Sequence, residues 1–255
     1  MAKSVQKKPS NTRFVGLIML VAIVGFAALG YAVSRPRAGI KPVDPTLPAG
    51  AAVGYLVGKA DAPVQVLEFG DFECPACGQW ANLTEPDVRE RLINTGQVAF
   101  RFFAFPLDMH KNTWPASNAV ACAADQGKFI EMHDRVFAAQ DKWNGEATSN
   151  PKAALTQLAS ETGIDMGKWE TCFDSQKHYA SFKGNIEEGV RRGVSQTPSF
   201  IIGSKLIPGN IPFDEFKKYV DEAAVEAAAA SKPAKASANA PSKVPAKAPA
   251  KAAKP

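Results

Sequence analysis

The apolar pattern of the chain begins with one long uncharged run near the N-terminus. Residues 14–33 hold 20 consecutive positions without a charge, and four Lys or Arg residues precede them without an acid. A helix of this length reaches about 30 Å, the thickness of the hydrocarbon core of a bilayer. The basic flank predicts a single-pass anchor with everything after it on the outer side. A cleaved signal peptide is the alternative, because Ala28-Leu29-Gly30 resembles a small-x-small cleavage site.

The pattern then changes to short apolar runs that alternate with helical periodicity. Residues 63–70 and 97–105 are rich in β-branched and aromatic side chains, which predicts two buried strands. A helix over 75–94, bent at Pro86, is predicted between them. The first half of the central region is therefore expected to be β-α-β.

About ninety residues of helical periodicity follow before strands return. A hairpin is predicted from 199–203 and 205–207, and an apolar stripe that starts at Phe213 predicts a C-terminal helix. Five helices are predicted between the two β-containing parts. One begins at Thr113, and the others cover 129–137, 151–162, 166–176 and 179–192. The order β-α-β, helices, β-β-α predicts an α/β fold with an inserted all-helical domain.

These changes in pattern divide the chain into seven segments. The predicted segments are a basic N-terminus (1–13), the anchor (14–33), a Pro/Gly linker (34–50), the first half of the α/β fold (51–106), the helical insertion (107–193), its second half (194–229) and a disordered Ala/Lys/Pro tail (230–255).

The net charge of +5 conceals an uneven distribution. Residues 1–44 carry +6 and residues 232–255 another +6, which leaves −7 for the region between them. An acidic body lacks the electrostatic support that nucleic-acid binding needs, so no nucleic-acid partner is expected. The basic tail is interpreted as a solubilising spacer or as a weak contact with anionic lipid.

The candidate chemistry lies in a C-P-A-C motif that follows the first predicted strand. Cys74 is placed at the N-cap of a helix and Pro75 at its first position, where a missing N–H costs nothing. The amides and the dipole of the helix would stabilise the Cys74 thiolate and lower its pKa into a range of roughly 3.5–7.5. Cys74 is therefore predicted to be the nucleophile, and Cys77, one turn further on, the buried resolving cysteine.

Other uses of a C-x-x-C motif do not fit the spacing. A zinc ribbon needs a second such pair or close histidines, and a c-type haem site needs His after the second cysteine, where this chain has Gly78. No metal site is expected. An inert structural disulfide remains the alternative to a redox-active one.

Two further positions fit redox chemistry. Glu68 lies within the first apolar strand, where a lone carboxylate is costly unless it pairs or exchanges protons. It is predicted to exchange the proton of Cys77, the alternative being a structural pair with a neighbouring lysine. Thr197 and Pro198 precede the third strand. A cis Pro198 would turn the Thr197 backbone toward the disulfide to pair with an extended substrate.

Three segments of the sequence together resemble the DsbA-like thiol:disulfide oxidoreductases, which have a thioredoxin fold interrupted by a helical domain. The segments are YLVGKADAPVQVLEFGDFECPACGQW, KFIEMHDRVFAAQ and GVSQTPSFIIG, and the resemblance covers roughly residues 54–222. It implies Cys74 as nucleophile, Cys77 as resolving cysteine, Glu68 as buried acid, and Thr197 and Pro198 as the cis-proline pair.

The resemblance also implies a location and partners. Members of the family oxidise newly exported proteins, so unfolded or reduced exported proteins are the expected substrates and a quinone-linked membrane oxidase the expected recharging partner. The protein is then expected in the bacterial cytoplasmic membrane, with its catalytic domain on the periplasmic side. Its redox-active disulfide would be its only redox group, with no separate cofactor.

The direction of the reaction is less determined than its chemistry. The motif has Pro-Ala between its cysteines, where strong oxidants of the family have Pro-His, so a reductase or isomerase on the same fold is an alternative. A non-enzymatic, anchored peptide-binding module is another.

Cys122 and Cys172 stand outside the C-x-x-C motif. Each shares a helical face with apolar residues, which places both thiols inside the helical domain. Some DsbA-like proteins join such a pair, so the resemblance implies a second, structural disulfide. Two unpaired buried thiols are the alternative.

Overall fold

The computed structural model describes residues 12–34 and 50–230, except for the side chains of 12–15, 28, 29 and 31–34. The predicted basic N-terminus (1–13), linker (34–50) and tail (230–255) lie outside these residues except at their edges. Those segments, and the proposed division of the chain into domains, therefore stay predictions.

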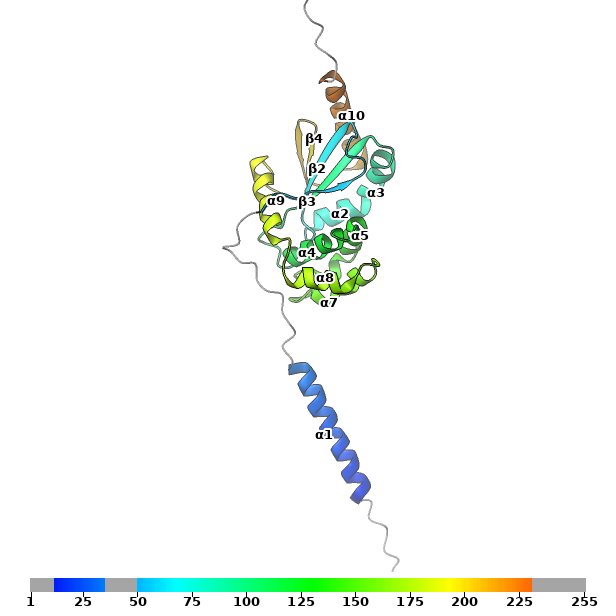
Figure 1. Ribbon diagram of the computed structural model, residues 1–255, viewed down its shortest axis with the longest axis vertical. Coiled ribbons are helices and arrows are strands. Elements are labelled where there is room, and N and C mark those ends of the chain that lie inside the picture. Colours follow the sequence, from blue (N-terminus) through cyan, green and yellow to red (C-terminus); the bar gives the residue numbers. More distant parts are fainter. Residues whose placement is uncertain (1–11, 35–49, 231–255) are drawn as a thin grey trace, which may run out of the picture.

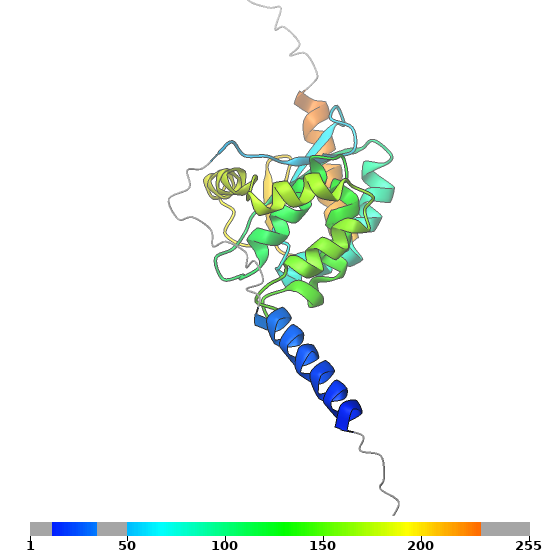
Figure 2. The same cartoon turned by 60° about the horizontal axis from the view of Figure 1, so that its bottom comes forward.

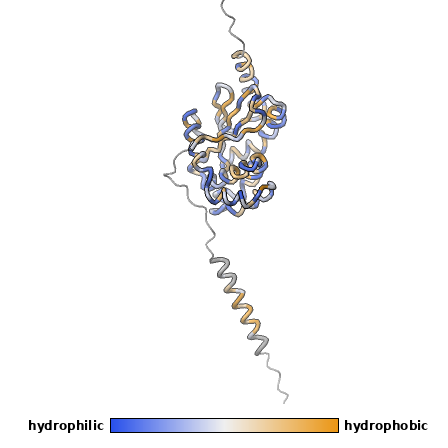
Figure 3. The backbone as a smooth tube through the Cα atoms, viewed as in Figure 1, coloured by the Kyte–Doolittle hydropathy of each residue, from blue (hydrophilic) through white to orange (hydrophobic). Residues whose placement is uncertain are grey.

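The apolar run near the N-terminus forms one helix, α1 (Thr12–Ser34), of 23 residues. Its described side chains, from 16 to 27 and at 30, are exposed, and Figure 3 shows their hydrophobic character. Among the described residues, no helix combines the length and the apolar character that a membrane crossing needs. The anchor over 14–33 therefore stays a prediction.

A five-stranded mixed sheet forms the centre of the body, in the order β1-β3-β2-β4-β5. The parallel neighbours β2 and β3 are joined through helices, whereas the other neighbouring strands are antiparallel. The strands are β1 (Tyr55–Val57), β2 (Val64–Gly70), β3 (Val98–Ala104), β4 (Ser199–Ile202) and β5 (Lys205–Pro208). This topology confirms the predicted α/β fold. The edge strand β1 was not predicted, because three residues are too few to show a period of two.

Helices cover the sheet and form a separate group at one end of it. Figures 1 and 2 show α4, α5, α7 and α8 gathered at the end of the strands from which α2 begins. The helices of the body are α2 (Pro75–Leu83), α3 (Glu85–Val88), the π-helical η1 (Arg89–Ile93), α4 (Thr113–Ala124), α5 (Phe129–Ala138), α6 (Gln140–Trp143), α7 (Lys152–Ser160), α8 (Met166–Asp174), α9 (Tyr179–Arg191) and α10 (Phe213–Ala230).

The single helix predicted over 75–94 is wrong, because the structure divides it. α2 ends at Leu83, and Thr84 is its C-cap and also the N-cap of α3. Pro86 lies in the first turn of α3, where the N–H groups of a helix have no partner within the helix. A proline is accommodated there more easily than inside a continuous helix.

Two aromatic clusters hold helices to the sheet. Trp80 of α2 contacts Phe200 of β4 and Phe216 of α10, with ring centroids 4.5 Å and 5.2 Å away. Phe72, which precedes α2, contacts Phe102 of β3 at 5.1 Å and Phe137 of α5 at 4.7 Å. The segment between β2 and α2 is therefore fixed against both the sheet and the helical insertion.

A buried amide joins α9 to the sheet. Asn185 is fully buried, and its Oδ1 accepts a hydrogen bond from the Val53 N–H at 2.7 Å. Its Nδ2 donates to the carbonyls of Val53 and Ala104, at 3.2 Å and 3.0 Å. One side chain thus satisfies three backbone groups, from the segment before β1 and the end of β3.

We expect Asn185→Ala to lower the free energy of unfolding by about 2 kcal/mol or more, because it leaves these buried backbone groups without partners. Urea denaturation would measure the loss. Asn94→Ala, at an exposed position, is the control and should change stability by less than about 0.5 kcal/mol. Equal losses in both variants would contradict the role of Asn185.

Candidate active site

Cys74 and Cys77 lie where β2 passes into α2, and both are free thiols in this structure. Cys74 is the N-cap of α2 with an extended backbone (φ −67°, ψ 123°), and Pro75 occupies the first turn. Cys74 is 8% exposed and Cys77 is completely buried. The two sulfur atoms therefore differ in their access to solvent, although they are only three residues apart.

The surroundings of Cys74 favour its thiolate. A hydrogen bond from the Cys77 thiol is the largest cause that lowers the pKa of Cys74, to about 6, and burial opposes it. A contact with Thr197 and the backbone N–H groups of Cys77 and Ala76 lower this pKa further. The helix amides that the sequence suggested do contribute, but the neighbouring thiol contributes more.

The surroundings of Cys77 favour its neutral form. Burial raises the pKa of Cys77 well above its usual value, and the Cys74 thiol and the charge of Glu68 act in the same direction. The backbone N–H of Asp71 lies 3.4 Å from Cys77 Sγ and opposes this shift. At neutral pH the reactive thiolate is therefore that of Cys74.

Glu68 lies in β2, paired with Phe102 of β3 and Phe200 of β4, and is 1% exposed. Burial raises the pKa of Glu68 well above its usual value, and the charge of Glu85 adds to the effect. The positive charge of Arg89 opposes this shift. The sequence left open a structural ion pair between Glu68 and a lysine, but the nearby cation is an arginine. The Oε2 atom of Glu68 has no hydrogen-bond partner among the described residues. Glu68 is thus a buried acid that holds its proton more tightly than an exposed carboxyl group.

The Thr197–Pro198 peptide bond is cis. The Cys74 thiol donates to the Thr197 carbonyl, with 3.4 Å between Sγ and O. The Pro198 carbonyl accepts a hydrogen bond from the Gly209 N–H at 2.7 Å. The structure therefore brings the Thr197 carbonyl, which precedes the cis Pro198, against Cys74 from a position more than 120 residues away in the sequence. The roles assigned to all five residues stay predictions.

Asp71 was not predicted from the sequence, and its buried carboxylate joins the C-x-x-C segment to the residues before α4. Its side chain is completely buried, and each carboxylate oxygen accepts two hydrogen bonds. Oδ1 accepts from the Glu73 N–H at 2.7 Å and from Thr113 Oγ1 at 2.6 Å. Oδ2 accepts from the Leu107 N–H and lies beside His110 Nδ1, both at 2.8 Å. Asp71 thus connects the C-x-x-C motif to the loop before α4.

Glu73 makes a second connection to the helical insertion. Its Oε2 accepts from the Asn112 N–H and its Oε1 from the Gly145 N–H, both at 2.5 Å. Two acids beside Phe72, directly before the motif, were a signal in the sequence, because buried carboxylates need donors. The sequence did not show which donors these would be.

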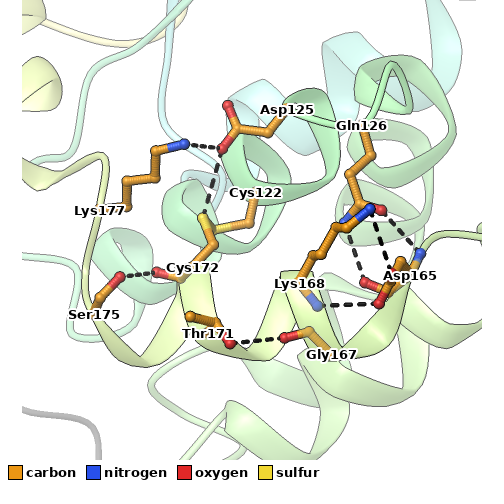
Figure 4. Close-up of a pocket in the computed structure, with 10 residues that line it drawn as sticks. All are labelled: Cys122, Asp125, Gln126, Asp165, Gly167, Lys168, Thr171, Cys172, Ser175 and Lys177. Carbon is orange, nitrogen blue, oxygen red and sulfur yellow. Dashed lines mark hydrogen bonds and ion pairs between the residues drawn. A yellow bond between two sulfur atoms is a disulfide. The ribbon is translucent and has the colours of Figure 1, made fainter.

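The second pair of cysteines forms a disulfide between α4 and α8. Cys122 and Cys172 are 50 positions apart, with 5.8 Å between their Cα atoms. They line a cavity of about 650 Å³. Figure 4 shows them there with Asp125, Lys177 and other polar residues. A ring nitrogen of His178 lies within 4.8 Å of both sulfur atoms. Because the two sulfur atoms are bonded to each other, they are not available as thiolate ligands for a metal ion.

The buried acid generates a prediction for pH-dependent stability. With a raised pKa, Glu68 keeps its proton in the folded state at pH values where the unfolded chain has lost it. The free energy of unfolding then falls as pH rises above the ordinary value of about 4.5. Glu68→Gln removes this loss, so its stability relative to the wild type should increase by at least about 1 kcal/mol from about pH 5 to about pH 8.

Urea denaturation at several pH values would measure this difference. Glu90→Gln, at an exposed position on the neighbouring η1, is the matched control and should follow the wild-type curve. A Glu68→Gln curve that runs parallel to the wild type would show that Glu68 does not hold the proton.

The chain is similar to proteins of known families. Residues 51–222 match the family model described as thioredoxin. Na(+)/H(+) antiporter NhaA 3 of Salinispora tropica is 29% identical over 202 residues, which are 73% of this chain but 29% of the antiporter. This chain thus spans less than a third of the length of that relative.

Two further similarities concern disulfide proteins. Probable disulfide bond formation protein D of Bacillus anthracis is 28% identical over 169 residues, which are 65% of this chain and 76% of that protein. The crystal structure of Wolbachia pipientis alpha-DsbA1 has a TM-score of 0.63 and 20% identity, over 72% of this chain and 97% of that one. Because the thioredoxin model matches well over half of the chain, the chain belongs to the thioredoxin family.

Proposed function

We propose that this protein transfers the Cys74–Cys77 disulfide to the thiols of exported proteins through a mixed disulfide. The observation that carries the proposal is the opposite effect of the fold on the two sulfur atoms. The pKa of Cys74 is lowered to about 6, whereas that of the buried Cys77 is raised. An exchange enzyme needs this difference, because the substrate must attack one sulfur, Cys74, while the other, Cys77, leaves the disulfide bond and stays protonated inside the protein.

In the first step a substrate thiolate attacks Cys74 Sγ of the oxidised enzyme. The new bond joins the substrate sulfur to Cys74, the Cys74–Cys77 bond breaks, and its electron pair goes to Cys77. Cys77 Sγ then needs a proton, because burial disfavours its charge. We assign this proton to Glu68, the buried acid whose charge the structure couples to Cys77.

In the second step another substrate thiolate attacks the substrate sulfur of the mixed disulfide. The substrate gains a disulfide and Cys74 leaves as a thiolate, so two electrons pass from substrate to enzyme. A low pKa makes Cys74 a good leaving group and stabilises the reduced enzyme, which favours oxidation of the substrate. An extended substrate would pair with the Thr197 backbone beside the cis Pro198.

The proposal includes a place in the cell and a way to recharge the enzyme. The Cys122–Cys172 disulfide suits an oxidising compartment, and the apolar run 14–33 suits an anchor in the bacterial cytoplasmic membrane. We place the catalytic domain on the periplasmic side. A quinone-linked membrane oxidase is the partner that would accept the two electrons.

The exchange step is tested with Cys77→Ser. Its Cys74 should form a stable mixed disulfide with a peptide whose single cysteine is supplied as a glutathione mixed disulfide, because no Cys77 thiol is present to resolve it. Mass spectrometry of the intact protein would detect the adduct. Cys74→Ser is the matched control and should form none, because Cys77 is buried and its pKa is raised. Equal capture by both variants would contradict the proposal. A biological function that Cys74→Ser leaves intact would favour the non-enzymatic, peptide-binding alternative.

The direction of the reaction is tested by the reduction potential. Because the Cys74 thiolate is stabilised, we expect a potential nearer to about −120 mV than to about −270 mV. Equilibration with glutathione mixtures, followed by quantification of the alkylated form, would measure it. A value close to that of thioredoxin, about −270 mV, would favour the reductase alternative.

A further inference from the structure

An imidazole lies beside the site, on the loop between β3 and α4. His110 Nδ1 is 2.8 Å from Asp71 Oδ2, and its side chain is 18% exposed. The Asp71 carboxylate is completely buried. This charged partner lies three residues before Cys74, so an imidazolium at position 110 faces the segment that carries the nucleophile.

The position of His110 is fixed by the backbone. The His110 N–H donates to the Leu107 carbonyl at 3.0 Å, and the Leu107 N–H donates to Asp71 Oδ2 at 2.8 Å. On the other side of the loop, Asn112 N–H donates to Glu73. The histidine is therefore held at both ends of its loop by the two acids that precede Cys74.

Asp71 connects the imidazole to both cysteines. The Cys74 N–H donates to the Asp71 carbonyl at 3.1 Å, which closes the turn from Asp71 to Cys74. The Asp71 N–H points to Cys77 Sγ at 3.4 Å. The carboxylate that orients His110 thus belongs to the residue whose backbone positions both sulfur atoms.

The charges around His110 favour its protonated form. The hydrogen bond with Asp71 is the largest cause that raises the pKa of His110, and the charges of Asp71, Cys74 and Glu73 add to it, whereas burial opposes it. These acids all come from the segment between β2 and α2, and Asp108 and Lys111 are the charged neighbours on its own loop. Since a charge interaction is mutual, an imidazolium that is stabilised by the Cys74 thiolate also stabilises that thiolate.

We propose that the His110 imidazolium, held in place by Asp71, supplies positive charge to the Cys74 thiolate and so sets the oxidising strength of the disulfide. The inference rests on the proposed function, because it assigns a control over the same nucleophile. His110 acts on Cys74 through its charge alone and forms no covalent bond with the substrate.

The test replaces His110 with Asn, whose amide nitrogen stands near the place of Nδ1 and can still donate to Asp71. The variant keeps the hydrogen bond and loses the charge. Titration of the thiolate by its ultraviolet absorbance should then show a higher midpoint for Cys74. At the pH where half of the wild-type Cys74 is ionised, about 6, alkylation of Cys74 should slow by about threefold or more. The equilibrium constant with glutathione should also shift toward a weaker oxidant.

The chain offers a matched control at a second His–Asp pair. His178 Nε2 lies 3.0 Å from Asp125 Oδ2, its side chain is 15% exposed, and the pair stands beside the Cys122–Cys172 disulfide. His178→Gln, whose amide nitrogen replaces Nε2, should leave the titration of Cys74 unchanged. His110→Lys should recover part of the lost thiolate, because it restores a positive charge.

An unchanged Cys74 midpoint in His110→Asn would overturn the inference, and so would an equal shift in His110→Lys or His178→Gln. Unfolding curves of each variant would show that it is folded when it is titrated. The titration needs no substrate, so the inference can fail while the exchange of Cys77→Ser with a peptide still succeeds. A failed exchange would instead reject the proposed function.

Discussion

The site depends on a buried carboxylate with a full set of donors. Asp71 is completely buried, and four groups from its own turn, the loop before α4 and α4 itself surround its two oxygen atoms. A buried acid without such partners would cost several kcal/mol. Because three of these four groups come from the helical insertion, the insertion and the C-x-x-C motif cannot shift independently. The hydrogen bonds of the buried Asp71 carboxylate thus help to set the geometry around Cys74.

The difference between the two cysteines follows from this rigid frame. Cys74 is at the mouth of α2, with the Thr197 carbonyl at 3.4 Å and the Cys77 thiol as a hydrogen-bond donor. Cys77 is one turn deeper, with no solvent contact and with Glu68 among the charges around it. The same helix therefore leaves the Cys74 sulfur partly accessible and stabilises its thiolate, whereas the Cys77 sulfur is buried and its thiolate is disfavoured. A flexible connection between β2 and α2 would average this difference away.

The helical insertion completes the site as well as covering it. Asn112 and Gly145 donate to Glu73, and Gln140 Nε2 donates to the carbonyls of Phe72 and Cys74 at 2.8 Å and 2.9 Å. Phe137 packs against Phe72 from the same side. The Cys122–Cys172 disulfide holds α4 and α8 of this domain together at a distance from the reactive pair. The insertion thus contacts the segment that carries Cys74 through both hydrogen bonds and aromatic packing.

The sequence by itself determined the order of the longer elements and the place of Cys74 at the N-cap of a helix. Hydrophobic period, turn residues and the N-cap signature of Cys74-Pro75 are local, so they could be read without the fold. The divided helix at Thr84, the short strand β1 and α6 escaped this reasoning, because three or four residues carry little periodic signal. The cis state of Pro198, the approach of Thr197 to Cys74, the donors of Asp71 and Glu73, and the place of His110 were decided by tertiary structure alone. Apart from the hydrogen bond between the Glu73 N–H and Asp71, these contacts join residues at least 36 positions apart, and their meeting depends on how the insertion packs on the sheet.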